Sequence, residues 1–469
     1  MNQANPAASR DWRATWSKVT ASNPVTVLFA IIFALIIGAV LIAAANPQVQ
    51  TTAGYLFARP GDFFKALGQS IGGAYAALFQ GSIINFQAGT LGGAISPLGE
   101  TIAYSVPLIF AGLALGIGFR AGLFNIGGQG QIMIGAVLCA WIGFGLHLPA
   151  GAHLLVALLG AIIGGAVWGF IPGILKATTG ANEVIVTIML NSIAGFLVAW
   201  LLTLDAFQVP GSNNPISPLV DSSARYPNIL GQSINLGIIL ALACAVGVWW
   251  LMERSTLGFQ IRAVGDNPDA ARSAGMNVRG TYVWVMLIGG ALCGLAATTP
   301  LLSNPPQALS LDIASTFGFD AITVALLGRS RPLGTVLAGL LFGGLRAGGY
   351  MMQAATDTPI DIVLVLQSVI VLAIAAPPLV RTIFHLPDPD RRSRPPRRQP
   401  LATSAVAGVA TSTAIPLAST SDPTLVAVSG SAAAASSPAT PAATAPATPA
   451  GPSGVIRRSD QGPALGVTL

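Results

Sequence analysis

Apolar residues in this chain form long stretches that polar segments separate. Ten such stretches lie at approximately 24–45, 98–119, 122–145, 152–174, 183–204, 235–252, 281–303, 316–328, 332–349 and 361–381. Most approach the roughly 20 residues that a helix needs to cross the hydrocarbon core of a bilayer. Residues 316–328 are too few unless the segment is tilted, broken or re-entrant. The pattern predicts an all-α, polytopic transmembrane helical bundle of about ten segments.

Basic residues lie mainly in the loops on one side of these stretches. With the amino terminus inside, 19 of the 23 Lys and Arg residues fall on the inner side, and the outer side receives only Arg59, Lys65 and Arg225. Cytoplasmic loops of membrane proteins are enriched in Lys and Arg. We therefore expect both termini in the cytoplasm and a multi-pass protein of the cytoplasmic membrane.

Composition agrees with a membrane protein and excludes several classes of function. Of the 469 residues, 53% are hydrophobic and 9% are charged, against about 25% charged in soluble domains. The net charge of +6 is explained by orientation and by attraction to lipid headgroups, so membrane lipid is expected as a partner and nucleic acid is not. No metal site is expected, because the three cysteines lie in apolar stretches without metal-ligand spacing.

Changes in composition along the chain predict a division into three segments. Residues 1–23 form a short cytoplasmic segment, and residues 24–385 form the membrane domain. From residue 386 to residue 469 the chain is rich in Arg and Pro and then in Ala, Pro, Ser and Thr. Such a segment buries too little apolar surface to offset the entropy of ordering. We expect a disordered cytoplasmic tail, whose arginines are either solvated or in contact with anionic lipid.

The run 120–136, RAGLFNIGGQGQIMIGA, places three amide side chains and five glycines at membrane depth. Amides in hydrocarbon need hydrogen-bond partners, and closely spaced glycines break a helix or let backbones approach. Two interpretations are open, the lining of a solute path and a glycine-packed helix interface. Asn125, Gln129 and Gln131 together favour the solute path.

Few charged residues lie inside the apolar stretches, the main ones being Glu100, Glu183, Asp320 and Arg346. An unpaired charge at the centre of a membrane helix costs about 2.5–3.5 kcal/mol on insertion scales. Asp320 and Arg346 each lie a few residues inward from the expected outer end of their segments. We expect them to form a structural ion pair, with a contact to substrate as the alternative.

The inner loop 253–280 is longer than the other inner loops and contains signals for a short helix over 268–274. An N-cap, a proline at the first position, an acidic residue in the first turn and a terminating glycine occur at Asn267, Pro268, Asp269 and Gly275. The small residues that would let another protein approach are Ala270, Ala271, Ser273 and Ala274. A helix in a merely solvated loop is the alternative.

The chain lacks a standard ATP-binding loop. A P-loop needs a Lys followed by Ser or Thr, but Lys18, Lys65 and Lys176 precede Val, Ala and Ala. If ATP drives transport, a separate subunit binds and hydrolyses it, and this chain is not an enzyme. An ion-coupled carrier or a passive channel, working without an ATPase, is the alternative from a different class.

Four blocks resemble the membrane permease subunits of ABC importers in the branched-chain amino-acid and ribose group, and most closely those associated with nucleoside uptake. The blocks are PLIFAGLALGIGFRAGLFNIGGQGQIMIGA at 107–136, GANEVIVTIMLNSIAG at 180–195, IRAVGDNPDAARSAGMN at 261–277 and GFDAITVALLGRSRPLGTVLAGLLFGGLRAGG at 318–349. They span most of the chain from about residue 100 to residue 350.

The resemblance implies an importer built from two permease subunits, identical or different, two ABC ATPase subunits that bind ATP and Mg²⁺, and an extracytoplasmic solute-binding protein or lipoprotein. This chain would itself bind no cofactor. The block 261–277 looks like the coupling helix, so the resemblance implies that the ATPase contacts Asp266, Asn267, Ala270, Ala271, Ser273 and Gly275.

The resemblance also assigns a solute path. The residues expected to line it are Asn125, Gln129, Gln131 and Asn191, with Asn182 and Glu183 near the cytoplasmic mouth. Amide side chains suit a polar, uncharged nucleoside, which we take as the expected solute. Ribose, another simple sugar or a branched-chain amino acid are the alternatives within the class.

Overall fold

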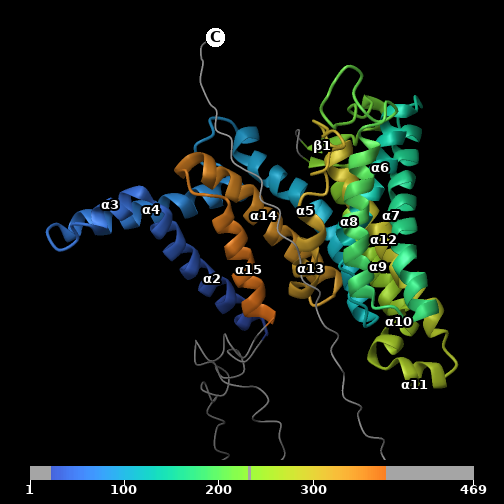
Figure 1. The fold of residues 1–469 in the computed structure, drawn as a ribbon. Helices are drawn as coiled ribbons and strands as arrows, with labels where there is room; N and C mark the ends of the chain where they lie inside the picture. Colours follow the sequence, from blue (N-terminus) through green and yellow to red (C-terminus); the bar gives the residue numbers. More distant parts are fainter. Residues whose placement is uncertain (1–22, 231–233, 376–469) are drawn as a thin grey trace, which may run out of the picture. The chain divides into compact units, whose positions relative to one another are not determined.

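The computed structural model describes residues 23–230 and 234–375 (Figure 1). The chain divides into two compact units, Met1–Arg397 and Arg398–Leu469, and only the first contains described residues. The predicted tail at 386–469 and residues 1–22 of the predicted amino-terminal segment therefore lie outside the described part. The helices are α2 Asn23–Ala45, α3 Pro47–Ala53, α4 Pro60–Ser82, α5 Leu91–Arg120, α6 Gly128–Gly145, α7 Ala152–Thr179, α8 Glu183–Leu201, η1 Ser222–Ala224, α9 Leu236–Arg254, α10 Thr256–Asp266, α11 Pro268–Ser273, α12 Val278–Leu302, α13 Phe317–Leu327, α14 Pro332–Thr356 and α15 Asp361–Ala375.

Every predicted apolar stretch contains a helix, which confirms the all-α polytopic bundle. Within the described residues, six helices are long and apolar enough to cross a membrane, namely α5, α6, α7, α8, α9 and α12. Residues 31–45 and helix α3, which meet at a bend of 76°, would together make a seventh span. Helix α13, in the stretch predicted at 316–328, has only 11 residues, which is too few to cross a bilayer as a straight helix. The sidedness of the loops stays a prediction.

The stretch predicted at 122–145 begins six residues too early. Helix α5 continues to Arg120, residues 121–127 are not helical, and α6 starts only at Gly128. The chain reverses at Gly122, whose φ of +70° suits glycine. Asn125 then accepts a hydrogen bond from the Gly127 N–H at 2.9 Å, a local bond that competes with helix formation.

Helices α5 and α12 form the centre of the main core. In each of these two helices, 78% of an apolar 18-residue segment is buried inside the protein, although each helix is long enough to span a bilayer. Helix α5 packs against α12, α13 and α14, and α12 packs against α7. Helices α7 and α12 approach closely because Gly165 has no side chain: a Cβ at this position would overlap the Gly290 carbonyl oxygen. The side chains of α5 and α12 therefore face protein, and any solute site must use the ends or gaps of this core.

The connection between α8 and α9 is fixed to one end of α12. It contains η1 and a small antiparallel hairpin of β1 Asn228–Leu230 and β2 Ile234–Asn235. The Tyr226 N–H donates to the Leu302 carbonyl at 2.8 Å, and the Tyr226 hydroxyl bonds the Thr298 hydroxyl at 2.7 Å. Burial raises the pKa of the Tyr226 phenol above its ordinary value. These bonds hold Asn235, the last residue of β2, beside the end of α12.

Candidate functional site

The amide segment, residues 125–131, is folded on itself. Asn125 and Gln131 are 3% and 1% exposed. The Asn125 Nδ2 donates to Oε1 of Gln131 at 3.2 Å. Both side chains therefore satisfy part of their hydrogen-bonding capacity inside the protein, as buried amides must.

Helix α8 holds this segment from the side. The Asn191 Oδ1 accepts the Gly130 N–H at 2.8 Å, and its Nδ2 donates to the Ile126 carbonyl at 2.9 Å. The Ile126 N–H donates to the Thr187 hydroxyl at 3.3 Å. Asn191 thus replaces the helical hydrogen bonds that the broken backbone lacks.

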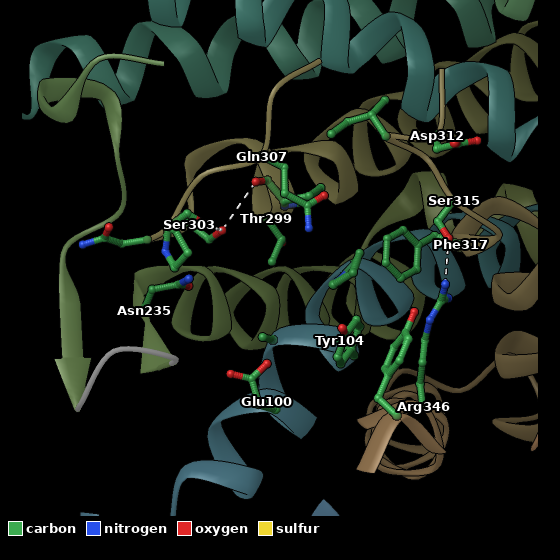
Figure 2. Close-up of a pocket in the computed structure, with 17 residues that line it drawn as sticks. Glu100, Tyr104, Asn235, Thr299, Ser303, Gln307, Asp312, Ser315, Phe317 and Arg346 are labelled. Carbon is green, nitrogen blue, oxygen red and sulfur yellow. Dashed lines mark hydrogen bonds between the residues drawn. The ribbon is translucent and has the colours of Figure 1, made fainter. Parts of the chain in front are cut away.

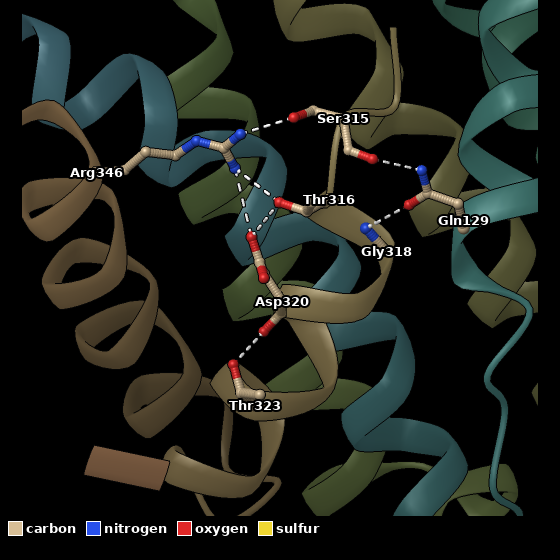
Figure 3. Close-up of polar contacts among 7 residues, drawn as sticks. All are labelled: Gln129, Ser315, Thr316, Gly318, Asp320, Thr323 and Arg346. Atoms are coloured by element: carbon tan, nitrogen blue, oxygen red, sulfur yellow. Dashed lines mark hydrogen bonds and ion pairs between the residues drawn. The ribbon is translucent and has the colours of Figure 1, made fainter. Parts of the chain in front are cut away.

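Gln129 connects the amide segment to the turn that precedes α13 (Figure 3). Its Nε2 donates to the Ser315 carbonyl at 2.6 Å, and its Oε1 accepts the Gly318 N–H at 3.0 Å. The predicted amides Asn125, Gln129, Gln131 and Asn191 all have protein partners. This geometry matches the glycine-packed interface that was the alternative interpretation, and their lining of a solute path stays a prediction.

Asn182 and Glu183 stabilise the turn between α7 and α8. The Asn182 side chain caps α8 by accepting the Val184 N–H at 3.0 Å. Glu183 pairs with Lys176 at 2.7 Å, and both side chains are mostly buried. This pair was not predicted from the sequence, although the two residues flank Gly180, which ends α7 with a φ of +70°. Their place at a cytoplasmic mouth is untested.

The predicted pairing of Asp320 with Arg346 is present (Figure 3). Arg346 Nη1 lies 3.3 Å from Asp320 Oδ2, and the two side chains are 21% and 17% exposed for Asp320 and Arg346. The Thr316 hydroxyl donates to the same carboxylate oxygen at 2.7 Å, and Arg346 Nη2 donates to the Ser315 hydroxyl at 2.6 Å. The guanidinium is thereby fixed in position and its charge is compensated.

Arg346 also lies between aromatic rings. Its guanidinium carbon is 4.9 Å from the ring centre of Phe317 and 5.8 Å from that of Tyr104. Tyr104 in turn stacks on Tyr350, with ring centres 5.6 Å apart and 27° between the planes. Three aromatic rings and one guanidinium therefore form a continuous wall, which we call the aromatic wall: Tyr104, Phe317, Arg346 and Tyr350.

The aromatic wall borders a cavity of about 440 Å³ (Figure 2). Its other polar lining residues come from α5, the end of β2, the end of α12 and the loop between α12 and α13: Glu100, Asn235, Thr299, Ser303, Asn304, Gln307, Asp312 and Ser315. The volume falls within the roughly 300–1,000 Å³ of small-molecule sites. Among the described lining residues the only cation is Arg346, which Asp320 neutralises. The described lining therefore combines aromatic rings with hydrogen-bonding groups and offers no available cation to a negatively charged ligand.

A second cavity of about 390 Å³ adjoins the first. It lies between α4, α5 and α14, and the two cavities share Glu100, Tyr104 and Tyr350 as lining residues. The stacked tyrosine pair therefore stands at the border between the two spaces. Neither cavity could be predicted from the sequence, because their walls come from elements that only tertiary packing brings together.

The predicted short helix in the loop 253–280 is present as α11. Its N-cap Asn267 accepts the N–H groups of Asp269 and Ala270 at 3.0 Å each, and Gly275 follows with φ of +82°. Of the residues expected to contact an ATPase, those that are exposed are Asp266, Asn267, Ala270, Ser273 and Gly275. Ala271 is 4% exposed and packs with Val264 and Val278, so it faces the loop itself in this conformation.

Helix α10 joins this loop to the amide segment, a contact that the sequence did not indicate. A Cβ at Gly265 would overlap the Arg120 carbonyl oxygen, and the backbone of Gly265 also lies against Gly122. Residue 122 is three residues before Asn125. Helix α10 is therefore in direct backbone contact with the segment that leads into the amide segment.

Comparisons with known proteins agree with this architecture. Residues 98–375 match the family described as "Branched-chain amino acid transport system / permease component". The guanosine ABC transporter permease protein NupP of Bacillus subtilis is 38% identical over 324 residues, which are 68% of this chain and 89% of that protein. No solved structure shows a significant match.

Two further relatives are a glucose permease and a second guanosine permease. The glucose ABC transporter permease protein TsgB13 of Haloferax volcanii is 34% identical over 59% of this chain and 75% of that protein. The guanosine ABC transporter permease protein NupQ of Bacillus subtilis is 29% identical over 55% of this chain and 84% of that protein.

Proposed function

Because this chain belongs to the branched-chain amino acid transport permease family, and is thus a multi-pass membrane permease of an ABC importer, we propose that its solute is a nucleoside. One observation carries the proposal: the chain is 38% identical to a guanosine permease over 89% of that protein's length. The cavity supports it, because its lining combines aromatic rings with hydrogen-bonding groups and a compensated charge. The glucose permease relative makes a simple sugar the second candidate.

The importer is proposed to contain two different permease subunits. NupP and NupQ of one organism are both named guanosine permease proteins, and this chain is 38% identical to the first and 29% to the second. That difference favours a partner of the NupQ type over a second copy of this chain. A separate ATPase that binds ATP and Mg²⁺, and an extracytoplasmic solute-binding protein, complete the proposed assembly.

Transport is proposed to proceed by alternating access. Closure of the ATPase would displace the exposed face of α11, and the rigid contact between Gly265 and Arg120 would pass this motion to the amide segment. Gln129 then connects the amide segment to Ser315, whose hydroxyl holds Arg346 in the aromatic wall. A continuous series of contacts thus links the ATPase-facing loop to the cavity.

Uptake of labelled guanosine by cells with and without this gene tests the proposal. Deletion should remove ATP-dependent uptake, and excess unlabelled nucleoside should compete whereas ribose, glucose and leucine should not. A variant with the exposed Ala270 replaced, Ala270→Arg, should insert normally and lose uptake through steric hindrance at the ATPase contact. Unchanged guanosine uptake after deletion, with reduced glucose or ribose uptake, would replace the nucleoside by a sugar.

A further inference from the structure

The cavity has two chemically different sides (Figure 2). The aromatic wall occupies one side, with Tyr104, Phe317 and Arg346 next to one another. Asn235 and Ser303 lie across from it. The Ser303 hydroxyl donates to the Pro305 carbonyl at 3.0 Å, so the Ser303 oxygen can still accept. Asn235 Oδ1 accepts the Gly237 N–H at 2.9 Å, so the Asn235 Nδ2 can still donate. We propose that this cavity is a nucleoside-binding site in which the base stacks on the aromatic wall and the ribose faces the amides and hydroxyls. The inference rests on the proposed function and assigns that solute a position.

A nucleoside fits this division better than the other solutes of the family. Its planar base offers a π-face that any aromatic ring can stack on, at about 1–3 kcal/mol per base. A free sugar has no such plane. A zwitterionic amino acid needs an available cation for its carboxylate, but Arg346, the only cation among the described lining residues, already pairs with Asp320.

Tyr350 is the ring of the wall on which a base has the best access. Its side chain is 45% exposed, whereas Phe317 is 7% exposed. Tyr104 stacks on Tyr350 with ring centres 5.6 Å apart and lines both cavities as well. The position of Tyr350 at the border of both cavities places the base where the two spaces meet.

Charge in the same cavity acts against nucleotides. Glu100 and Asp312 are carboxylates on its lining, and the positive charge of Arg346 is compensated. A nucleotide phosphate would lie near the exposed Asp312 carboxylate and would meet no cation other than the paired Arg346 among the described lining residues, which raises its free energy in the cavity. The site therefore selects the neutral nucleoside over its phosphate ester.

Photolabelling locates the solute directly. Membrane vesicles containing the full importer are irradiated with 8-azidoguanosine, and the adducts are mapped by mass spectrometry. We expect adducts on the segments that carry Tyr104 and Tyr350, suppressed by excess guanosine and unaffected by ribose or guanosine 5′-monophosphate. In the Asp312→Asn variant, guanosine 5′-monophosphate should also suppress labelling. Adducts confined to the amide segment would overturn the assignment.

Kinetics of ring variants give an independent readout. Tyr350→Ala should raise the KM for guanosine roughly tenfold through loss of base stacking, whereas Tyr350→Phe should stay near wild type. Tyr55→Ala is the matched control, since Tyr55 is 44% exposed and lines neither cavity. Equal KM values in Tyr350→Ala and the control would overturn the site.

The two proposals fail in different ways. Guanosine uptake with normal KM in Tyr350→Ala and adducts elsewhere would remove the site and leave the nucleoside importer standing. Absence of guanosine uptake by the wild-type importer, with labelling suppressed by glucose, would overturn the nucleoside solute and the base-stacking site together.

Discussion

The amide segment and the cavity both concentrate polar groups within the helical bundle, yet they use them differently. In the amide segment the side chains of Asn125, Gln131 and Asn191 bond to one another or to backbone, and two of them are almost fully buried. In the cavity, the buried Thr299 hydroxyl has no hydrogen-bond partner among the described residues, and the half-exposed Tyr350 lines the space. The comparison shows that a polar motif in an apolar chain, such as the amide segment, can stabilise a break between two helices. The proposed contacts to the solute come instead from residues that are far apart in the sequence.

The largest effect is expected where the amide segment meets the ATPase-facing loop. Gly265→Ala places a methyl group on the Arg120 carbonyl, a backbone atom that no rotamer change can move away. Helix α10 must then separate from the end of α5, so uptake of the solute should be abolished. Gly247→Ala, on α9, is the control, because no atom lies within 4 Å of the added carbon. Normal uptake by Gly265→Ala would show that this contact transmits no motion.

A smaller effect is expected from breaking the ion pair behind the aromatic wall. Arg346→Met leaves the Asp320 carboxylate unpaired, which should lower the free energy of unfolding by about 3 kcal/mol. Arg346→Met/Asp320→Asn removes that charge and should recover most of the loss. Unfolding in detergent micelles, followed across this double-mutant cycle, measures both changes. A double variant as unstable as the sum of the two single variants would contradict the pairing.

The amide segment itself should respond in stability. Asn191→Leu leaves the Gly130 N–H and the Ile126 carbonyl without partners, which should cost about 2 kcal/mol. Asn182→Ala, which removes one helix cap on the same helix, should cost about 1 kcal/mol. Unfolding temperatures in the same micelles rank the two. If Asn191→Leu changed solute kinetics at full stability, the segment would belong to the solute path.

Much of the fold could be predicted from the sequence, because apolar runs and helix caps are local signals. The ten helices in the apolar stretches and α11 follow from them, and the scarcity of buried charge indicated the pair of Asp320 and Arg346. The break at 121–127 was misplaced, since it depends on the side-chain bond of Asn125 to the Gly127 N–H. A glycine-rich sequence does not specify where such a bond forms.

The candidate site could be predicted only in part. Tyr104 and Tyr350 are separated by more than two hundred residues, and Asn235 and Gln307 belong to still other elements. Their proximity results from the packing of α5 against α12 and α14, which no local pattern encodes. Gln129 was predicted to line the solute path, which stays a prediction, and its bonds to Ser315 and Gly318 place it behind the aromatic wall.

Accessibility of single cysteines distinguishes the two regions most directly. In a background with Cys139, Cys244 and Cys293 replaced by Ala, Ser303→Cys probes the cavity and Asn125→Cys probes the amide segment. Both are assayed in vesicles that retain guanosine uptake, with a water-soluble methanethiosulfonate reagent. The cavity cysteine should react and be protected by guanosine, while the cysteine at position 125 stays unreactive. Protection by guanosine at position 125, with an unreactive cysteine at position 303, would contradict the account.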